Sequence, residues 1–314
     1  MTDTPTRAGF AAVLGAPNAG KSTLVNRLVG SKVSIVTRKV QTTRFPVRGV
    51  AMEGQAQIVL VDTPGVFSPR RRLDRAMVKA AWAGAQDADA VVHLVDAEAE
   101  IASAAKDATG GQHRGVEDTR TITEGLKAAG HKAILALNKI DMVKRDQLLG
   151  IADAFYKTEA YSEVFMLSAE NGSGVGDLKV RLAGLMPEGP WLYPEDQTAD
   201  LPARLLAAEI TREKVYLRVH EELPYAAAVE TTAFEEKKDG SARIEQTIYV
   251  ERESQRPIVL GKGGQTLKWI GQKSREDLAE ILDRPIHLFL TVKVVEDWQN
   301  KRDFYRDTGL EFDV

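Results

Sequence analysis

The feature that most constrains the fold of this chain is a short segment near its amino terminus. Residues 15–22 read GAPNAGKS, after an apolar run at 10–14 that suits a buried strand and before an amphipathic run at 23–29 that suits a helix. This strand–loop–helix order is typical of a phosphate-binding loop, because glycines let successive backbone N–H groups turn toward phosphate oxygens. The expected contact residues are Gly15, Ala16, Pro17, Asn18, Ala19, Gly20, Lys21 and Ser22.

Two side chains of this loop suit a nucleoside triphosphate. Lys21 can place a positive charge toward the β- and γ-phosphates. The Ser22 hydroxyl is a hard oxygen ligand of the kind that Mg²⁺ prefers. The loop therefore predicts a magnesium–nucleotide site whose base is selected elsewhere in the chain.

Length and composition favour two globular domains in a reducing compartment. The 314 residues are 43% hydrophobic and 28% charged, which is ordinary for a protein with a sizeable core. No apolar run approaches the 18 or more residues of a transmembrane helix, and the first ten residues lack the pattern of a secretory signal. Cysteine is absent, which excludes disulfides and thiolate metal sites. We expect a cytoplasmic protein.

Residues 1–188 read as alternating strands and helices, and they predict an α/β domain with a doubly wound, mostly parallel sheet. Apolar runs suited to parallel strands occur at residues 56–61, 90–95, 133–137 and 164–167, and a more polar run at 44–52 resembles an edge strand. Ligands of such folds lie at the carboxyl ends of the strands. Residues 98–120 interrupt the pattern, and we expect a surface insertion with a short helix at most.

Residues 189–202 contain three of the chain's prolines and predict a semi-rigid linker. The remainder, residues 203–314, predicts a small α+β domain. It has a helical run at 203–211, strand-like runs at 226–234, 242–251 and 286–295, and helical runs on both sides of GKGG at 261–264.

Four further segments lie at ends of predicted strands. Asp62, Thr63, Pro64 and Gly65 follow the run at 56–61, where Asp62 can hold Mg²⁺ through water and the Gly65 N–H can meet a γ-phosphate oxygen. In the loop before the strand at 44–52, a threonine hydroxyl can complete the Mg²⁺ shell; we favour Thr43, with Thr42 as the competing choice. The alternative for that segment is an ordinary polar loop.

The segment Asn138, Lys139, Ile140 and Asp141 predicts guanine specificity. A carboxylate accepts from two parallel donors, and guanine presents N1–H and N2–H₂ side by side, whereas adenine offers no such pair. We expect Asp141 to select guanine, Asn138 to brace neighbouring loops and the Lys139 stem to lie over the ring. Ser168 and Ala169 follow the last strand, where the Ala169 N–H is expected to donate to guanine O6.

Together these motifs resemble the translation-factor-class GTPases. GAPNAGKS, QTTR, DTPG, NKID and SAENG, followed by a carboxyl-terminal GKGG domain, are similar to the Era family of bacterial ribosome-assembly GTPases. The resemblance implies GTP or GDP and Mg²⁺ as ligands, with slow turnover. The glutamine that orients water in Ras-like enzymes is replaced by Val66, so the resemblance implies K⁺ as transition-state charge, with Asn18 as its ligand. The expected catalytic residues are Asn18, Lys21 and Thr43.

The GKGG segment predicts RNA binding. A G-x-x-G loop between helices is typical of KH domains, which clamp about four nucleotides of single-stranded backbone. Residues 252–275 contain six basic residues and one acid, although the whole chain has a net charge of −3. The resemblance to the Era family implies a type-two KH domain. We expect Trp269 and Trp298 to be core residues and not platforms on which bases stack. The expected RNA-binding residues are Gly261, Lys262, Gly263, Gly264, Arg252, Arg256, Lys268 and Lys273.

The same resemblance implies the partners. It points to the single-stranded 3′ end of 16S ribosomal RNA and to the small (30S) ribosomal subunit, bound by a monomer, and it leaves peripheral association with the inner membrane open. One alternative is an RNA-binding scaffold with little GTP hydrolysis. Another is a GTPase that modifies transfer RNA or binds membranes, which needs a further catalytic domain or cysteine chemistry that this chain lacks.

Overall fold

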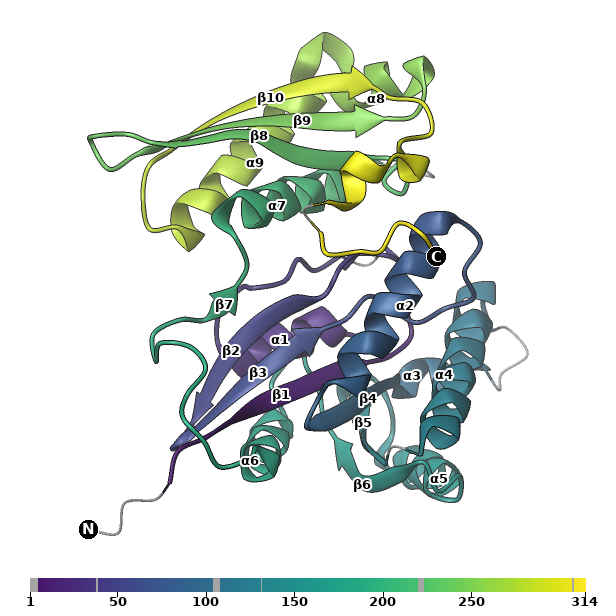
Figure 1. Cartoon of the computed structure of the whole chain (residues 1–314). Helices are drawn as coiled ribbons and strands as arrows, with labels where there is room; N and C mark the ends of the chain where they lie inside the picture. The colour runs from purple at the N-terminus through teal and green to yellow at the C-terminus, as the bar shows by residue number, and fades with distance from the viewer. Residues whose placement is uncertain (1–4, 38, 104–107, 131, 220–222, 307) are drawn as a thin grey trace. The chain divides into compact units, whose positions relative to one another are not determined.

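The computed structural model describes residues 5–37, 39–103, 108–130, 132–219, 223–306 and 308–314. Residue contacts divide the chain into two compact units, shown in Figure 1. The amino-terminal unit comprises Met1–Ser34, Thr43–Asp200 and Asp313–Val314, and the carboxyl-terminal unit comprises Ile35–Thr42 and Leu201–Phe312.

A seven-stranded sheet forms the centre of the amino-terminal unit, with the strand order β6-β5-β4-β1-β3-β2-β7. Strands β3, β1, β4, β5 and β6 are parallel, whereas β2 is antiparallel to β3 and β7. This confirms the predicted mostly parallel sheet. The strands are β1 Arg7–Leu14, β2 Val47–Glu53, β3 Ala56–Asp62, β4 Ala90–Asp96, β5 Ala133–Asn138, β6 Tyr161–Met166 and β7 Ala199–Asp200.

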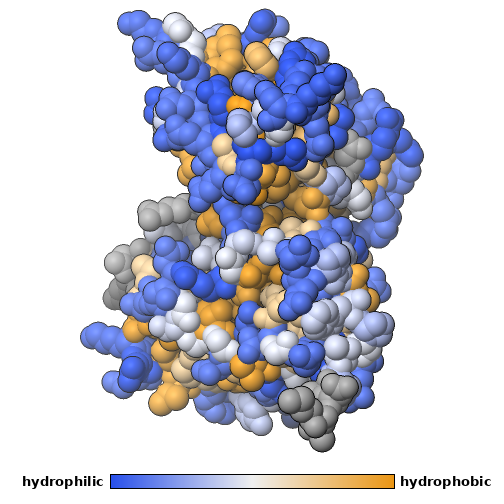
Figure 2. Space-filling model, turned by 90° about the vertical axis from the view of Figure 1, so that its left-hand side faces the viewer, coloured by the Kyte–Doolittle hydropathy of each residue, from blue (hydrophilic) through white to orange (hydrophobic). Residues whose placement is uncertain are grey.

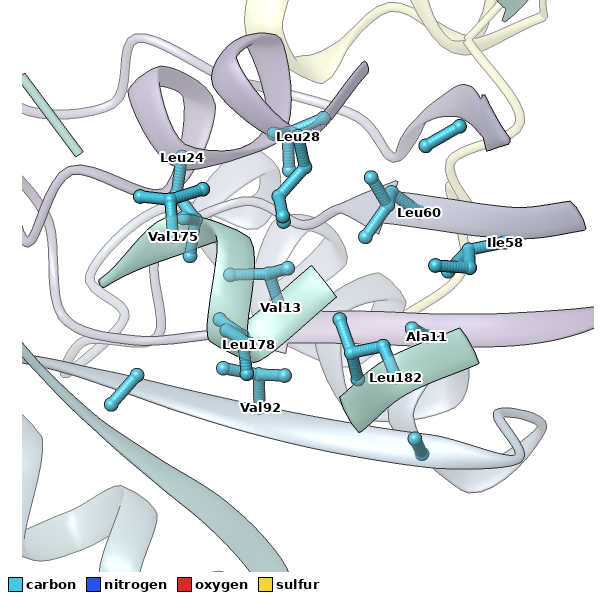
Figure 3. Close-up of a cluster of buried hydrophobic side chains, with 14 of the residues drawn as sticks. Ala11, Val13, Leu24, Leu28, Ile58, Leu60, Val92, Val175, Leu178 and Leu182 are labelled. Atoms are coloured by element: carbon cyan, nitrogen blue, oxygen red, sulfur yellow. The ribbon is translucent and has the colours of Figure 1, made fainter. Parts of the chain in front are cut away.

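Helices cover both faces of this sheet because successive residues of each buried strand point to opposite faces. On one face, the strands pack against α1, through Leu24 and Leu28, and against α6, through Leu178 and Leu182. Leu60 of β3 belongs to the same buried cluster (Figure 3). The other face packs against α2, α4 and α5. The helices are α1 Lys21–Val29, α2 Arg72–Gln86, α3 Ala97–Ser103, α4 Gly110–Ala129, α5 Arg145–Tyr156 and α6 Val175–Leu185.

The expectation of a short helix at most between residues 98 and 120 was wrong. Apart from residues 104–107, which lie outside the described residues, this interval is largely helical, in α3 and the 20-residue α4. Thr109 and Gln112 form a capping box: the Thr109 hydroxyl accepts from the Gln112 N–H at 3.3 Å, and the Gln112 side chain accepts from the Thr109 N–H at 2.8 Å. Val116, Ile122 and Leu126 bury one face of the helix. Glycines and polar residues obscured this amphipathic pattern.

The carboxyl-terminal unit has the order helix–strand–strand–helix–helix–strand, which confirms the expected type-two KH arrangement. Its sheet order is β10-β9-β8, with β10 parallel to β9 and β8 antiparallel to β9. Trp298 is 3% exposed and is a core residue as expected, whereas Trp269 is only partly buried and packs against the outside of the core cluster. The elements are α7 Ala203–Arg218, β8 Ala228–Glu236, β9 Ala242–Val250, α8 Arg256–Leu260, α9 Gln265–Ile281 and β10 Ile286–Val294.

The interval expected to be a linker, residues 189–202, is fixed to the amino-terminal unit along much of its length. Its β7 pairs with β2. The fully buried Gln57 of β3 accepts from the backbone N–H groups of Leu192 and Tyr193 at 2.8 and 2.9 Å and donates to the Tyr193 carbonyl at 2.8 Å. The Tyr193 hydroxyl donates to Asp200 at 2.7 Å.

The polar character of the surface agrees with the 28% of charged residues in the sequence. Hydrophilic residues cover most of the visible surface of each unit in Figure 2, and apolar residues form smaller patches. None of the described helices combines the length and the apolar character that a bilayer-spanning segment needs.

Candidate functional site

The predicted nucleotide-binding segments all leave the sheet at the carboxyl ends of its strands. The 15–22 loop follows β1, Asp62 ends β3 and Asn138 ends β5. Because β1 pairs with both β3 and β4, and β4 pairs with β5, the parallel order brings these three ends to one edge of the sheet. This is where ligands bind in open parallel sheets.

The 15–22 loop requires its glycines. A Cβ on Gly15 would lie 2.6 Å from the Leu94 carbonyl oxygen. Gly20 has φ +98°, and a Cβ there would lie 2.4 Å from the Asn138 side-chain nitrogen. Helix α1 begins at the next residue, Lys21. Its first N–H groups thus face the loop, which is the arrangement that binds phosphate.

Lys21 is folded onto the loop. Its ammonium donates to the carbonyl oxygens of Gly15 at 3.1 Å and Ala16 at 3.0 Å, and the residue is only 6% exposed. Burial lowers the pKa of Lys21 to about 8, and the nearby Asp62 carboxylate opposes that shift. The lysine is therefore a poorly solvated cation that would gain from an anion in the loop.

A cluster of three oxygen-bearing side chains lies beside Lys21. The Ser22 hydroxyl donates to Asp62 Oδ2 at 2.7 Å, the Thr43 hydroxyl donates to the same atom at 3.2 Å, and the two hydroxyl oxygens are 2.8 Å apart. The Thr42 hydroxyl instead contacts Thr37 at 2.7 Å and donates to the Lys39 carbonyl at 2.7 Å. The structure thus brings Thr43, and not Thr42, to the predicted metal ligands.

This cluster fits Mg²⁺. Asp62 is fully buried, burial raises its pKa, and its Oδ1 is buried without a hydrogen-bond partner. An unpaired buried carboxylate oxygen is costly unless a cation or water meets it. Over the described residues, no group of three or more His, Cys, Asp or Glu side chains forms a metal site. Mg²⁺ here would use the carboxylate and two hydroxyls with phosphate oxygens and water, which suits its preference for few protein ligands.

The segment after Asp62 packs directly on the phosphate-binding loop. The Thr63 hydroxyl donates to the Val13 carbonyl at 2.7 Å, and the Val66 N–H donates to the Gly15 carbonyl at 3.2 Å. A Cβ on Gly65 would lie 3.1 Å from Pro17, so glycine allows the close approach. The Val66 side chain is 2% exposed and apolar, so it has no group that orients water.

Asn138 braces the neighbouring loops, as expected. Its Nδ2 donates to the Ala19 carbonyl at 2.7 Å, and its Oδ1 accepts from the Ala169 N–H at 2.9 Å. The expected bond from the Ala169 N–H to guanine O6 stays a prediction, and it requires Asn138 to share or release this N–H when the base binds. Ser168 is fully buried, and its hydroxyl accepts from the Asn171 N–H at 3.3 Å, which holds the loop.

The two remaining residues that are predicted to bind the base lie on a short turn. Lys139 has a left-handed backbone, with φ +63°, and starts the 3₁₀ turn Ile140–Met142 that carries Asp141. Asp141 is exposed and lines a 550 Å³ cavity with Arg145 of α5 and with Asn171. The carboxylate is therefore accessible to a ligand.

Two residues that support this site were missed from the sequence. Asp96 ends β4, and its Oδ2 lies 2.5 Å from the Lys139 ammonium. Arg27 of α1 donates to the carbonyl oxygens of Ala169, at 3.3 Å, and Glu170. Asp96 could have been found because, like Asp62, it is an acid directly after a buried apolar run. Arg27 lies in an amphipathic helix, and nothing near it in the sequence marks its contacts.

Residues Ile35–Thr42 belong to the carboxyl-terminal unit and are bound by α7. Glu213 accepts from the Val36 N–H at 2.9 Å, and the buried Arg212 donates to the Thr42 carbonyl and to Glu209. Thr43 follows Thr42 directly in the chain but belongs to the amino-terminal unit.

The GKGG turn joins α8 to α9. Gly261, Gly263 and Gly264 have φ values of +72°, +61° and +77°, and a Cβ on Gly261 would lie 2.3 Å from the Thr266 hydroxyl oxygen. Lys262 is exposed. Three other predicted RNA-binding residues are also exposed, namely Arg252, Arg256 and Lys268. The fourth, Lys273, is partly buried and forms an ion pair with Glu276 at 2.6 Å.

Two known protein families match this chain, one in each unit. The family described as 50S ribosome-binding GTPase matches residues 10–139, and the KH domain family matches residues 222–299. The GTPase Era of Caulobacter vibrioides (strain NA1000 / CB15N) is 73% identical over 316 residues, and that of Maricaulis maris (strain MCS10) is 62% identical over 314 residues. Both alignments cover 100% of this chain and 100% of the relative.

Two solved Era structures have the same fold. Each gives a TM-score of 0.86 at 36% identity and covers 97% of this chain and 99% of the solved chain. One is a variant of Aquifex aeolicus Era bound to GDP and AlF₄⁻. The other is Era in complex with MgGDPNP and nucleotides 1506–1542 of 16S ribosomal RNA.

The lowered pKa of Lys21 predicts proton uptake on ligand binding. A phosphate beside the ammonium favours its charged form, so binding of GDP without Mg²⁺ should raise the pKa of Lys21 from about 8. At pH 8 the free protein should then take up about half a proton, against about a tenth at pH 7. Titration calorimetry in buffers of different ionisation enthalpy measures the uptake, and equal values at the two pH values would contradict this account.

Proposed function

The chain belongs to the Era family of GTPases, and from that membership we propose a nucleotide-controlled switch that binds the single-stranded 3′ end of 16S ribosomal RNA. It assists assembly of the small (30S) ribosomal subunit and maturation of its RNA, in the cytoplasm and as a monomer. The observation that carries the proposal is the cluster of Ser22, Thr43 and Asp62 beside Lys21, in one chain with an exposed GKGG turn.

At the nucleotide site, Ser22, Thr43 and Asp62 would hold Mg²⁺. When bound, the ion neutralises charge on the β- and γ-phosphate oxygens. Lys21 would turn its ammonium from the carbonyls of Gly15 and Ala16 to the phosphates, since an ammonium bonds more strongly to an anionic phosphate oxygen than to a neutral carbonyl. With the γ-phosphate bound, the Thr43 hydroxyl would complete the Mg²⁺ shell, and loss of the γ-phosphate would remove that ligation and release the loop.

The path of the chain from Thr43 to the segment bound by α7 supports switching between nucleotide states. Thr43 contacts the predicted metal ligands, and the segment just before it is bound by Glu213 and Arg212 of α7. Because Thr42 and Thr43 share a peptide bond, a change in the position of Thr43 pulls on a segment held by the KH helix. This is the route by which we propose that nucleotide state affects RNA binding.

Hydrolysis is proposed to use a monovalent cation. Val66 has no polar group that can orient the attacking water, so hydrolysis has to draw on another contribution, and a cation beside the β/γ bridging oxygen can supply one. Asn18 lies in the loop with a left-handed backbone, φ +64°, and its side chain is exposed. We infer that Asn18 is a K⁺ ligand.

We therefore expect Asn18→Ala to lower GTP hydrolysis by about tenfold or more in potassium buffer, because it removes a contributor to transition-state charge. GDP affinity should change little, and sodium buffer should give a slow rate for wild type and variant alike. Phosphate release assays measure all four rates. Equal wild-type rates in potassium and sodium would refute the cation's role.

Base selection is proposed to rest on Asp141. Asp141→Asn should lower GTP affinity by about a hundredfold or more, because an amide cannot accept from both guanine donors. It should raise affinity for XTP, whose C2 carbonyl can accept from the new amide. The exposed Asp177→Asn on α6, which does not line the cavity at Asp141, is a matched control with the same loss of charge. Competition with labelled GDP measures the affinities, and an unchanged order of GTP and XTP would argue against this base site.

RNA binding is proposed to use the GKGG turn and the exposed Arg252, Arg256 and Lys268, with Lys273 contributing less because Glu276 pairs with it. The positive φ values let a sugar–phosphate backbone approach the turn closely. Helices α8 and α9 pack beside β10, which is the edge strand of its sheet, so its backbone groups are available to nucleobases. A strand of RNA lying between the turn and β10 fits these features.

Replacing Lys262 and Gly263 with aspartate should weaken binding of the 3′-terminal 16S sequence by about tenfold or more, and wild-type affinity should fall as salt rises. GTP affinity should be unchanged. The matched control is Lys237→Asp with Gly240→Asp in the exposed turn between β8 and β9, which makes the same change in charge. Fluorescence anisotropy measures binding, and equal losses in variant and control would contradict a specific role for the turn.

A further inference from the structure

Asp96 belongs to none of the motifs that predict the nucleotide site, yet its carboxylate is held inside that site. It ends β4, the strand between β1 and β5, and is paired in register with Asn138. Oδ1 accepts from the Ala99 N–H at 3.1 Å, and Oδ2 lies 2.5 Å from the Lys139 ammonium. Side-chain exposure is 18% for Asp96 and 29% for Lys139, so the pair is partly shielded from water.

The contact fixes the far end of a flexible side chain. The Lys139 backbone is set by its left-handed conformation and by the bond from the Met142 N–H to its carbonyl at 3.0 Å. Its four-carbon stem would otherwise sample many rotamers, and ordering them on ligand binding costs entropy. An ion pair made before the ligand arrives removes part of that cost.

A second acid, Glu100 on α3, lies near this pair and is only partly ionised near neutral pH. Burial raises the pKa of Glu100 on α3 to about 7, the negative charge of Asp96 adds to the shift, and Arg120 of α4 opposes it. Asp96, and not Glu100, is the carboxylate that is bonded to the Lys139 ammonium. Its geometry also does not depend on Glu100, because both of its oxygens are already bonded.

We propose that Asp96 is a positioning residue for guanine binding. Its carboxylate holds the Lys139 ammonium so that the methylenes of the lysine lie across the face of the base that Asp141 recognises. This inference rests on the proposed guanine site. It predicts a loss of nucleotide affinity without a loss of turnover, because Asp96 contacts neither the phosphates nor the proposed metal ligands.

Asp96→Asn separates positioning from a purely structural role. Asparagine still accepts from the Ala99 N–H, so α3 keeps its start, but the charge that faces Lys139 is lost. The Kd for GDP and the KM for GTP should rise about fivefold, the size expected of a partly buried ion pair, and kcat should stay within about twofold. Asp96→Ser, which also keeps a capping oxygen, should behave alike.

A double-mutant cycle completes the test. In a Lys139→Ala background, Asp96→Asn should have no further effect, because the pair is already broken. Glu98→Gln on α3 makes the same change in charge and should leave the Kd for GDP unchanged. Unaltered GDP affinity of Asp96→Asn, or the same loss in the Lys139→Ala background, would overturn the inference. If Asp141→Asn failed to alter base preference, the proposed guanine site itself would fail, whatever Asp96 does.

Discussion

The nucleotide site depends on one buried carboxylate. Asp62 accepts two hydroxyl bonds on Oδ2, whereas its buried Oδ1 has no hydrogen bond of normal geometry and, among the described residues, only the Ser34 hydroxyl as a polar side-chain neighbour. A buried charge of this kind is costly unless it is compensated, and Lys21 alone compensates it only in part. Because the bonds join β3, α1 and the segment at Thr43, a ligand that satisfies the free oxygen acts on three parts of the chain together.

The rest of the site is arranged so that its donors and acceptors are occupied before a ligand arrives. Lys21 bonds to loop carbonyls, Asn138 bonds to Ala19 and Ala169, and Lys139 bonds to Asp96. Binding then exchanges existing bonds for stronger ones to charged phosphate, and it does not have to order free side chains. Preorganisation of this kind reduces the entropic cost of association.

The motifs were predictable because their chemistry imposes fixed spacing on the sequence, as in the loop at 15–22 and the GKGG turn. Other features were not, since they depend on tertiary neighbours. The Ala169 N–H has two candidate acceptors, and only the fold shows that Asn138 takes it. Glycines near the start of α4 masked a capping box at Thr109. Asp96 carries an obvious local signal, an acid at a strand end, but its partner lies 43 residues away in the chain.

Gln57 has a practical consequence for dissecting the molecule. Its buried amide is satisfied by the backbone at Leu192 and Tyr193, and β7 covers the edge of β2. A recombinant fragment cut at residue 188 would lose those partners, which leaves the Gln57 amide without its backbone bonds and exposes the edge of β2 to pairing with another chain. Terminating the fragment after Asp200 retains both, and would yield better-behaved material for crystallisation or spectroscopy.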